Sequence, residues 1–306
     1  MAPRSSAVTV RAGRRNVEVS NPDKVFYPET GFTKADVVRY YQDVAPVLLP
    51  HVKDRLVTLK RYPDGVEGGF FYEKQCPKHR PDWVGTAPMK RKDGVTINYC
   101  LLNDRAALAW AANLANLELH TSLARAGRLD RPRSLVFDLD PGEGTDALDC
   151  ARVALWIREV FSDLGLESFA KTSGSKGIQM FVPVSTAATF DDTRAWAHAV
   201  ALRLASEHPD AIVTKQSKAE RVGKVLIDWS QNDDHKTTVS VYSLRARPRP
   251  TVSTPVTWAE VEGALDSGDA PALVFESHEV LARIEEQGDL FEPVLKLRQK
   301  LPPPPE

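Results

Sequence analysis

The chain has 306 residues, of which 42% are hydrophobic and 26% are charged, and its formal net charge at pH 7 is −1. This composition is that of a globular protein with a sizeable core, so it excludes a disordered or fibrous chain. No apolar run reaches the roughly 18 residues of a membrane helix and no apolar leader follows the start, so we expect a cytoplasmic protein without a membrane partner. The near-zero charge also excludes a protein that binds nucleic acid with its whole surface, so any such role must rest on local basic patches.

The chain contains three cysteines, Cys76, Cys100 and Cys150. An odd number of widely spaced cysteines in a chain of this size predicts free thiols in a reducing compartment rather than a disulfide framework. Cys76 and His79 have the spacing of two zinc ligands, but the sequence shows no second pair at a suitable distance. We therefore interpret this pair as a surface feature rather than as a zinc site.

Both ends of the sequence are predicted to be flexible margins. Residues 1–15 are polar and basic without periodicity, and residues 296–306 form a proline-rich tail. Between them the sequence shows no internal repeat and no long Gly/Ser linker. We therefore expect residues 16–295 to form one compact unit.

The first half of this unit mixes strands and helices. Residues 16–28 alternate like a short strand that leads into a turn, and Thr33 with Asp36 forms the capping-box pattern of a helix that extends to residue 48. Residues 57–102 contain short apolar stretches separated by turn sequences, which predicts hairpins. A second helix is predicted from Arg105 to Leu114.

The region from residue 134 to residue 230 has the most regular pattern. Strand-like runs and amphipathic helices follow one another in the order β-α-β-β-α-β. This split βαβ order predicts a sheet whose helices cover one face and whose other face is free to build a site. The fold class is therefore predicted to be α+β, with a strand-rich N-terminal subdomain and peripheral helices after residue 249.

Asp138 and Asp140 flank Leu139 on a predicted strand, so both carboxylates project from the same face. Adjacent carboxylates repel each other unless a cation lies between them, and Mg²⁺ or Mn²⁺ bound there would suit nucleotidyl transfer. Such a pair alone is more often part of a solvated edge strand. Asp228, however, ends a second apolar run, where a charge is costly without a partner. Convergence of the three aspartates would form a site for two divalent ions.

The sequence Ser-Gly-Ser-Lys-Gly at residues 173–177 is a predicted turn between two strands. Its glycines allow the backbone to approach an anion, and its hydroxyls and Lys176 can donate to phosphate oxygens. The spacing is not that of a Walker A loop, and similar turns are common in ordinary hairpins. The turn is a candidate triphosphate site only in combination with the aspartates.

Taken together, these motifs resemble those of the archaeo-eukaryotic primase superfamily, and most closely the polymerase domain of bacterial ATP-dependent ligase D. The resemblance rests on residues 21–34, 60–75, 117–120, 136–144, 171–177 and 225–245. It implies a primase-type fold with an RRM-like catalytic sheet, and a primase-polymerase catalytic domain over the compact unit. Because no ligase or nuclease domain follows in the sequence, we expect a stand-alone relative or an excised domain.

The resemblance also implies roles for individual residues. Asp138, Asp140 and Asp228 match the catalytic, metal-binding carboxylates of the family. The residues expected at the incoming nucleotide are Lys60, Phe71, Tyr72, His120, Ser173, Ser175, Lys176, Gly177, Gln179, Gln231, Ser243 and Arg245. Among these, Phe71 and Tyr72 match a pair of aromatic residues that stacks on a base.

Three further residues are implied to contact DNA. Lys24 and Lys34 match the pair that recognises a downstream 5′-phosphate, and Arg221 matches a template contact. The sequence departs from the family in two places. Gln179 stands where the superfamily often has histidine, so it cannot carry charge there, and Tyr72 stands where phenylalanine is usual.

The resemblance implies a polymerase of bacterial non-homologous end joining that acts at DNA ends, gaps and 5′-phosphorylated duplexes. It would add NTPs, in preference to dNTPs, to a primer 3′-hydroxyl with two Mn²⁺ or Mg²⁺ ions. It would act at the nucleoid with Ku and an ATP-dependent DNA ligase. Two alternatives stay open: a primase that starts chains de novo, against which Lys24 and Lys34 argue, and a non-catalytic DNA-end-binding module. The aspartates argue against the module, because binding alone needs no carboxylates that repel DNA.

Overall fold

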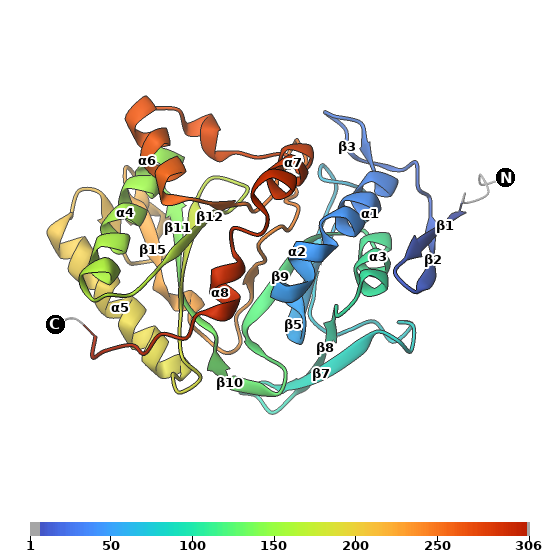
Figure 1. Ribbon diagram of the computed structural model, residues 1–306, viewed down its shortest axis with the longest axis horizontal. Coiled ribbons are helices and arrows are strands. Elements are labelled where there is room, and N and C mark those ends of the chain that lie inside the picture. The colour runs from blue at the N-terminus through green and yellow to red at the C-terminus, as the bar shows by residue number, and fades with distance from the viewer. Residues whose placement is uncertain (1–6, 305–306) are drawn as a thin grey trace.

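The computed structural model describes residues 7–304 and consists of two lobes side by side along its long axis (Figure 1). The first lobe is built around a sheet that contains β5 (Arg55–Arg61) and β9 (Asn116–Arg125). The second lobe is built around a sheet that contains β11 (Ser134–Pro141). In the part of the chain that is described, no helix has the length and apolar character needed to cross a bilayer.

The first lobe combines an antiparallel sheet with three helices. Its other strands are β6 (Phe71–Glu73), β7 (Gly85–Lys90), β8 (Thr96–Leu101), β10 (Arg128–Pro132) and β16 (Thr238–Val239). The strand order is β10-β9-β5-β8-β7, and β6 pairs with β5 while β16 pairs with β9. Helices α1 (Lys34–Asp43), α2 (Ala45–Val52) and α3 (Arg105–Asn113) share one hydrophobic core with β5 and β9. The short strands β3 (Val25–Tyr27) and β4 (Phe32–Thr33) pair with each other beside α1.

Helix α1 begins at the predicted capping box. The Thr33 side chain accepts from the backbone N–H of Asp36, and the Asp36 carboxylate accepts from the backbone N–H of Thr33 at 2.9 Å. This pair satisfies N–H groups that have no partner inside the helix. The predicted continuation to residue 48 is interrupted at Val44, where α2 begins with a proline in its first turn. Proline is tolerated there because the first helical N–H groups need no intrahelical acceptor.

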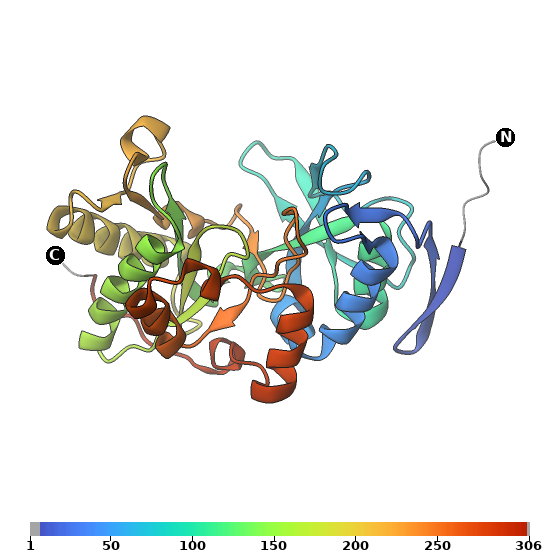
Figure 2. The ribbon, with the colours of Figure 1, turned by 90° about the horizontal axis from the view of Figure 1, so that it is seen from above.

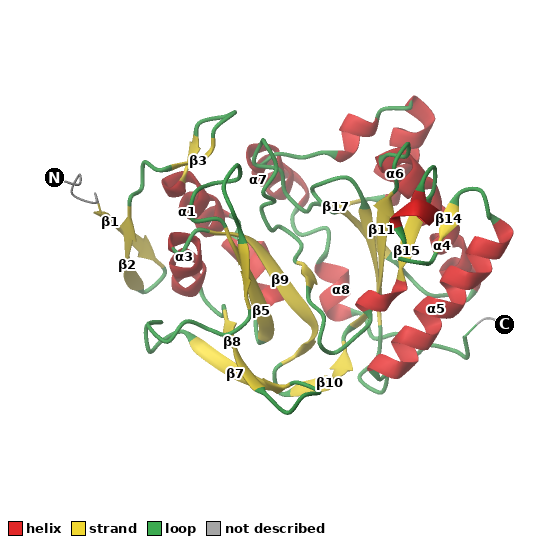
Figure 3. Ribbon diagram, turned by 180° about the vertical axis from the view of Figure 1, so that it is seen from behind, coloured by secondary structure: helices red, strands yellow, loops and turns green. Residues whose placement is uncertain are grey.

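The second lobe confirms the predicted β-α-β-β-α-β order. Its remaining strands are β12 (Phe169–Thr172), β13 (Ile178–Pro183), β14 (Ile212–Val213), β15 (Val225–Asp228) and β17 (Pro255–Val256). Helix α4 (Ala147–Asp163) follows β11, and α5 (Phe190–Glu207) follows β13. The sheet order is β14-β15-β11-β13-β12-β17, and α4 and α5 lie on its outer side (Figure 3). The α+β fold class is therefore as predicted.

Shorter helices complete the second half of the chain. They are η1 (Lys218–Arg221), η2 (Trp229–Gln231), α6 (Trp258–Ser267), η3 (Ala270–Leu273), α7 (Ser277–Gln287) and α8 (Glu292–Lys296). Helix α6 packs beside α4, whereas α7 and α8 lie between the two lobes (Figure 1). The peripheral helices predicted after residue 249 are thus present.

Strand β11 separates two environments. Phe137 and Leu139 pack with α4 and α5 in the core of the second lobe, whereas Val136 belongs to the core of the first lobe. Because side chains alternate along a strand, Asp138 and Asp140 lie on the same side as Val136. Both carboxylates therefore face the first lobe rather than the helices.

The N-terminal segment differs from its prediction. Residues 7–15 were expected to be flexible, but β1 (Ala7–Ala12) and β2 (Arg15–Ser20) form an antiparallel hairpin at one end of the molecule (Figure 2). Gly13 supplies the positive φ of +62° that the tight turn requires. Val17 and Val19 of β2 are buried, which explains why this segment is ordered. The expectation for residues 1–6 lies outside the described residues.

The proline-rich tail is also partly packed. Gln299 forms a β-bridge with Val184, and the indole N–H of Trp196 donates to the Pro302 carbonyl at 2.7 Å. Residues 299–302 therefore lie against the second lobe instead of forming a flexible margin. The last two residues, 305–306, are not among those described.

The structure bonds Cys76 to Cys100, so the prediction of free thiols is wrong for these two residues. The backbone N–H of Cys76 donates to the Asn98 carbonyl at 2.7 Å, which brings the segment after β6 alongside β8. The bond also removes Cys76 from any zinc site with His79. Cys150 is a buried free thiol on α4.

Candidate active site

The two lobes meet at a pocket of about 440 Å³. The first lobe contributes Tyr72 on β6 and His120 on β9, and the second lobe contributes Asp138 and Asp140 on β11. The pocket is also lined by Pro141, Ser173, Ser175, Lys176, Gln179, Arg221, Gln231, Thr237, Thr238, Val239 and Arg245. Residues far apart in the sequence, including most of those predicted at the site, therefore surround one cavity.

Four polar residues form a row across the second sheet. In the register of the antiparallel strands, Asp228 pairs with Asp138, Asp138 with Gln179, and Gln179 with Lys171. Residues directly opposite each other share one face of a sheet, so the row lies on the pocket side. Lys171 is fully buried and donates to Gln179 Oε1 at 2.5 Å and to Ser253 Oγ at 2.6 Å. Burial lowers the pKa of Lys171 to about 7, although the charge of Asp138 opposes the fall.

The carboxylates of this row repel one another. Burial raises the pKa of Asp138 to about 7, and the charges of Asp140 and Asp228 add to the rise. Burial also raises the pKa of Asp140, while the guanidinium of Arg221 acts in the opposite direction. A divalent cation near these oxygens would favour their ionised forms.

The three aspartates fit a metal site in their chemistry, because all are hard oxygen donors on one face of the sheet. Their present arrangement is not a closed ligand set. Asp228 Oδ1 accepts a hydrogen bond from the Ser230 hydroxyl at 2.5 Å, and Oδ2 accepts one from Gln231 Nε2 at 2.8 Å. No group of three or more His, Cys, Asp or Glu side chains among the described residues is arranged to hold a metal ion. The two-ion site therefore stays a prediction, and it requires Asp228 to exchange these hydrogen bonds for metal ligation.

The turn between β12 and β13 is held by its own hydrogen bonds. Ser173 Oγ accepts from the N–H groups of Ser175 at 3.2 Å and Gly177 at 3.0 Å, and Ser173 N–H donates to the Gly177 carbonyl at 2.8 Å. Gly174 has a positive φ of +66°, which glycine adopts without a steric cost. The compact turn presents Ser175 and Lys176 to the pocket, whereas Gly177 lies against β11.

Gln179, which the resemblance sets at a position often held by histidine, bridges two neighbouring side chains. Its amide Nε2 donates to Thr238 Oγ1 at 3.0 Å, and its Oε1 accepts from Lys171. A neutral amide can donate and accept at the same time, so it links the two residues. Gln179 also lines the pocket, but its hydrogen bonds hold the row in place.

Glu118 on β9 is a candidate that the sequence analysis did not single out. Its carboxylate contacts Lys60 Nζ at 3.2 Å, His120 Nε2 at 2.9 Å and Arg245 Nε at 3.4 Å. Glu118 lies within the segment 117–120, but no pattern in the sequence indicates that Lys60 and Arg245 converge on it. Arg245 also donates to the Ser173 carbonyl, which connects this cluster to the turn of the second lobe.

The aromatic residues at the pocket differ from the predicted pair. The rings of Tyr72 and His120 are T-shaped with centroids 5.9 Å apart, and Phe70 meets Tyr72 in the same way at 5.9 Å. Phe71 packs under the guanidinium of Arg61, 5.1 Å from its ring centroid. Successive residues of a strand point to opposite faces, so Phe71 and Tyr72 cannot both face the pocket. Phe70, which is 53% exposed, is the neighbour of Tyr72 on its side.

Two other predicted nucleotide contacts lie outside the pocket wall. Ser243 is fully buried, and its hydroxyl accepts from the Leu119 N–H at 2.9 Å and donates to the Leu244 carbonyl at 2.9 Å. The hydroxyl is thus engaged with the backbone and supports β9. Lys60 lies behind the wall, where it pairs with Glu118 and approaches the Phe70 ring to 4.6 Å.

The predicted 5′-phosphate residues lie close together at the start of α1. Lys34 is the first residue of the helix, and its Nζ donates to Ser20 Oγ at 3.2 Å. Burial lowers the pKa of Lys34 to about 8, with further contributions from the charges of Lys24 and Arg61. Lys24 Nζ pairs with Asp64 at 2.8 Å on an exposed surface. The charges of Lys24 and Lys34 at the helix N-terminus, with that of Arg61 nearby, suit a phosphate group.

Comparison with known proteins identifies the family. The family model described as "LigD, primase-polymerase domain" matches residues 33–291. The chain is 40% identical over 280 residues to the "Multifunctional non-homologous end joining protein LigD" of Mycolicibacterium smegmatis, which covers 91% of this chain and 36% of that protein. It is 32% identical over 276 residues to the "Bifunctional non-homologous end joining protein LigD" of Bacillus subtilis, covering 90% and 43%.

A solved structure is also similar. It is the "Polymerase Domain from Mycobacterium tuberculosis Ligase D in complex with DNA", with a TM-score of 0.85 and 38% sequence identity. The match covers 92% of this chain and 99% of that one. The chain spans less than half the length of the two LigD proteins named above. With the two-lobed fold and the pocket between the lobes, these matches show that the chain belongs to the LigD primase-polymerase domain family.

Proposed function

We propose that this domain transfers nucleotides to DNA ends and gaps in bacterial non-homologous end joining. A primer 3′-hydroxyl attacks the α-phosphate of an incoming nucleotide, pyrophosphate leaves, and ribonucleotides and Mn²⁺ are preferred. The relatives are named as end-joining proteins and the similar structure contains DNA, which supports this role. The proposal extends to a cytoplasmic, nucleoid-associated setting with Ku and an ATP-dependent DNA ligase as partners.

The observation that carries the proposal is the composition of the pocket. The pocket presents buried carboxylates that repel one another together with hydroxyl, imidazole and cationic donors. Carboxylates are unfavourable neighbours for a phosphate unless a cation lies between them, whereas the donors bind phosphate directly. A nucleoside triphosphate with divalent ions satisfies the carboxylates and the donors at once.

The donors and the carboxylates have separate tasks. Ser175, Lys176 and Arg245 donate to the triphosphate, and Tyr72 offers a ring on which a base can stack. Asp138, Asp140 and Asp228 would hold one or two divalent ions, whose charge would stabilise the attacking and leaving oxygens. The row that includes Gln179 and Lys171 keeps Asp138 in place.

The cations at the start of α1 bind a 5′-phosphate on the downstream strand. Lys34 is mostly protonated at pH 7, because its pKa is about 8. Its charge is lost as the pH rises through this value. Stimulation of extension by a 5′-phosphate should therefore decline above about pH 8, and replacement of Lys34 by glutamine should remove the stimulation.

The test is primer extension on a gapped duplex with and without a downstream 5′-phosphate, in Mn²⁺ with either NTPs or dNTPs. Asp138→Ala should lower the rate more than about 100-fold, because it removes a group that stabilises charge in the transition state. Asp210→Ala, at an exposed aspartate of the α5–β14 connection, is the matched control and should extend at the rate of the unmodified protein.

The outcomes of this assay distinguish an end-joining polymerase, a primase and a non-catalytic end-binding module. Extension that needs Asp138 and is stimulated by the phosphate supports an end-joining polymerase. Chains started without a primer would instead support the primase. No extension with any metal or nucleotide, together with intact binding to DNA ends, would refute catalysis and support the end-binding module.

A further inference from the structure

Glu118 is the most densely contacted carboxylate near the pocket. It is 2% exposed on β9. Oε1 accepts from Lys60 Nζ at 3.2 Å, from the Tyr62 hydroxyl at 3.3 Å and from the Ala246 N–H at 3.1 Å. Oε2 lies 2.9 Å from His120 Nε2 and 3.4 Å from Arg245 Nε. Both oxygens are therefore surrounded by donors.

This environment keeps Glu118 ionised. Burial alone would raise its pKa, but the hydrogen bond with His120 and the charges of Arg245 and Lys60 hold the pKa of Glu118 well below its usual range. An ionised carboxylate accepts hydrogen bonds and cannot donate them. The ring nitrogen Nε2 of His120 must therefore carry a hydrogen in this contact.

That requirement determines what the other ring nitrogen can do. In a neutral imidazole with hydrogen on Nε2, Nδ1 is an acceptor, and it would repel a phosphate oxygen. Only in the imidazolium form does Nδ1 also carry a hydrogen, with which it can donate to phosphate. His120 lines the pocket, so its protonation decides whether it attracts or repels a triphosphate there.

We infer that Glu118 is a positioning residue that leaves Nδ1 of His120 free for the triphosphate and favours the imidazolium form, so that nucleotide binding is linked to protonation of His120. This inference rests on the proposed function, since it assigns His120 to the nucleotide of that reaction. Glu118 fixes which nitrogen of the ring is free, and its charge favours the imidazolium. It also holds Lys60 and Arg245 beside the same ring.

Charged and titratable groups reach His120 from every side. On its own strand it contacts Glu118, from β5 it is approached by Lys60, and from the segment after β16 by Arg245. The ring of Tyr72 on β6 lies 5.9 Å away. Asp138, Asp140 and Lys176 of the second lobe line the same pocket as His120.

These groups act in opposite directions on His120. Burial lowers its pKa, the hydrogen bond and charge of Glu118 raise it, and the cations Arg245 and Lys60 lower it further. Glu118 is the strongest of the influences that favour the imidazolium, and the net result is a pKa of His120 below its usual value. Removal of its charge should therefore move the titration of His120 to lower pH.

The test is the Glu118→Gln variant, which keeps the shape of the side chain and removes its charge. Two-dimensional NMR of the imidazole groups should show a His120 midpoint at least one pH unit lower than in the unmodified protein, with the signal assigned by His120→Gln. Calorimetry with a non-hydrolysable ATP analogue and Mg²⁺ should show affinity falling at correspondingly lower pH. Glu118→Asp, which keeps the charge, should restore the midpoint most of the way.

A double-mutant cycle separates the pH dependence caused by the Glu118–His120 pair from that caused by titration of the aspartates and of the nucleotide. In the His120→Gln background, Glu118→Gln should leave the pH dependence of binding unchanged, because the titrating ring is gone. An unchanged NMR midpoint in folded Glu118→Gln protein would overturn the inference. If the midpoint moves as expected in Glu118→Gln but the unmodified protein binds no nucleotide, the proposed function is refuted, and with it the triphosphate role.

Discussion

Asp138 shows how a site residue can cost stability. Its pKa is raised to about 7 by burial and by Asp140 and Asp228, so the folded protein binds a proton more tightly than the unfolded chain does. The favourable protonated form is present at low pH and is lost as the pH rises through about 7. In metal-free buffer at pH 8, Asp138→Asn should therefore raise the free energy of unfolding by roughly 2 kcal/mol.

The measurement is urea unfolding in a chelator at pH 5 and pH 8. The gain from Asp138→Asn should shrink toward pH 5, where the native side chain is protonated, and Asp210→Asn should change stability by less than about 0.5 kcal/mol at both values. Added Mn²⁺ should stabilise the unmodified protein more than the variant. A variant that is less stable at pH 8 would contradict the electrostatic account.

Some site residues were predictable from the sequence and others were not. Asp138 and Asp140 could be assigned to one face, because a strand alternates with a fixed period of two. The same alternation could have shown that Phe71 and Tyr72 face opposite ways. The contacts of Glu118 could not be foreseen, since Lys60 and Arg245 reach it only through tertiary packing. The burial of Ser243 likewise depends on its position behind β9.

Gly177 couples the turn of residues 173–177 to the strand that holds the aspartates. A Cβ at Gly177 would overlap the carbonyl oxygen of Leu139, which lies between Asp138 and Asp140. A backbone atom cannot turn aside as a side chain can, so Gly177→Ala should displace the strand or the turn. We expect a loss of about 2 kcal/mol in the free energy of unfolding and weaker nucleotide binding.

Both effects can be measured by chemical denaturation and calorimetry. Gly127→Ala is the matched control, because a Cβ at Gly127 meets open space. It should leave nucleotide binding unchanged and the free energy of unfolding within about 0.5 kcal/mol of that of the unmodified protein. If Gly177→Ala behaved like this control, the close approach of turn and strand would have no energetic role.

A buried network fixes the connection between α7 and α8. Asp289 Oδ2 lies 2.8 Å from His51 Nε2 on α2, and Asp289 Oδ1 accepts from the Tyr242 hydroxyl at 2.7 Å. Burial would raise the pKa of Asp289, but the hydrogen bond and charge of His51, with the hydroxyl of Tyr242, hold it below its usual value. The stability that Asp289 supplies is therefore present above about pH 4 and lost as the pH falls through the lower folded pKa.

Asp289→Asn should reduce the free energy of unfolding by about 2 kcal/mol at pH 7, because a charged acceptor is removed from two donors. The difference from the unmodified protein should narrow below pH 4, where the native carboxyl becomes protonated. Urea midpoints at pH 7, 5 and 3.5 measure this change. A difference that stays constant over this range would show that the charge of Asp289 contributes nothing.

Elements with a local signal were the most predictable. The start of α1 follows from the capping box of Thr33 and Asp36, and the β-α-β-β-α-β order follows from periodicity. The hairpin of β1 and β2 was missed because its strands are short and rich in polar residues, and its stability comes from Val17 and Val19. The bond between Cys76 and Cys100 depends on spatial proximity, which cysteine spacing does not encode.

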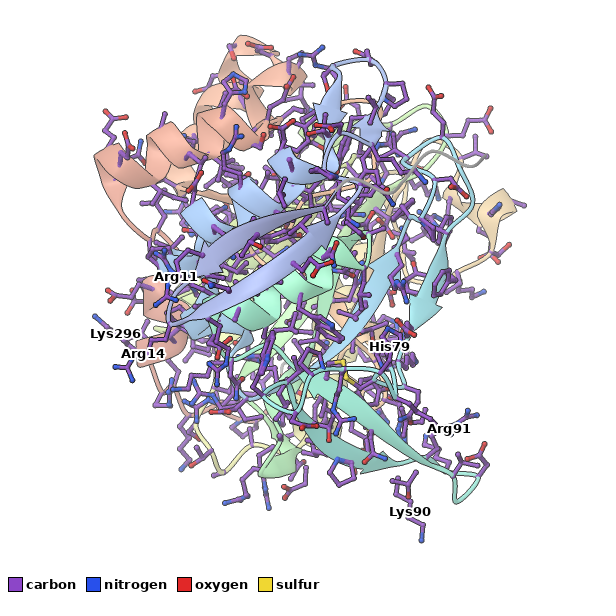
Figure 4. All side chains as sticks on the ribbon, turned by 90° about the vertical axis from the view of Figure 1, so that its right-hand side faces the viewer. Arg11, Arg14, His79, Lys90, Arg91 and Lys296 are labelled. Carbon is purple, nitrogen blue, oxygen red and sulfur yellow. A yellow bond between two sulfur atoms is a disulfide. The ribbon has the colours of Figure 1, made fainter. Side chains whose placement is uncertain are left out.

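Across the surface of the molecule, the basic side chains are dispersed rather than gathered in one continuous patch. Arg11 and Arg14 lie on the N-terminal hairpin, whereas Lys90 and Arg91 lie at a separate edge of the first lobe (Figure 4). With a net charge of −1, the remaining surface offers DNA little general attraction. Binding to a phosphorylated end should therefore depend on the few cations at the start of α1 and beside the pocket.

This distribution predicts a shallow dependence of DNA binding on salt. Contacts from Lys24, Lys34 and Arg221 would release about three counterions, so log K should fall with log salt at a slope of about −3 on a 5′-phosphorylated gap. A protein that binds with its whole surface would show a slope of about −6 or steeper. Fluorescence anisotropy between 50 and 300 mM salt measures this slope.

The decisive comparison pairs two double variants with the same change in charge. Lys24→Gln with Lys34→Gln should reduce the magnitude of the slope by about two on phosphorylated DNA and by less on DNA without the phosphate. Arg11→Gln with Arg14→Gln should leave both slopes unchanged, because these residues lie at the turn end of the hairpin, opposite the end where Ser20 contacts Lys34 (Figure 4). Equal effects of the two variants would mean that total charge, and not the placement of cations at the start of α1, governs binding to DNA ends.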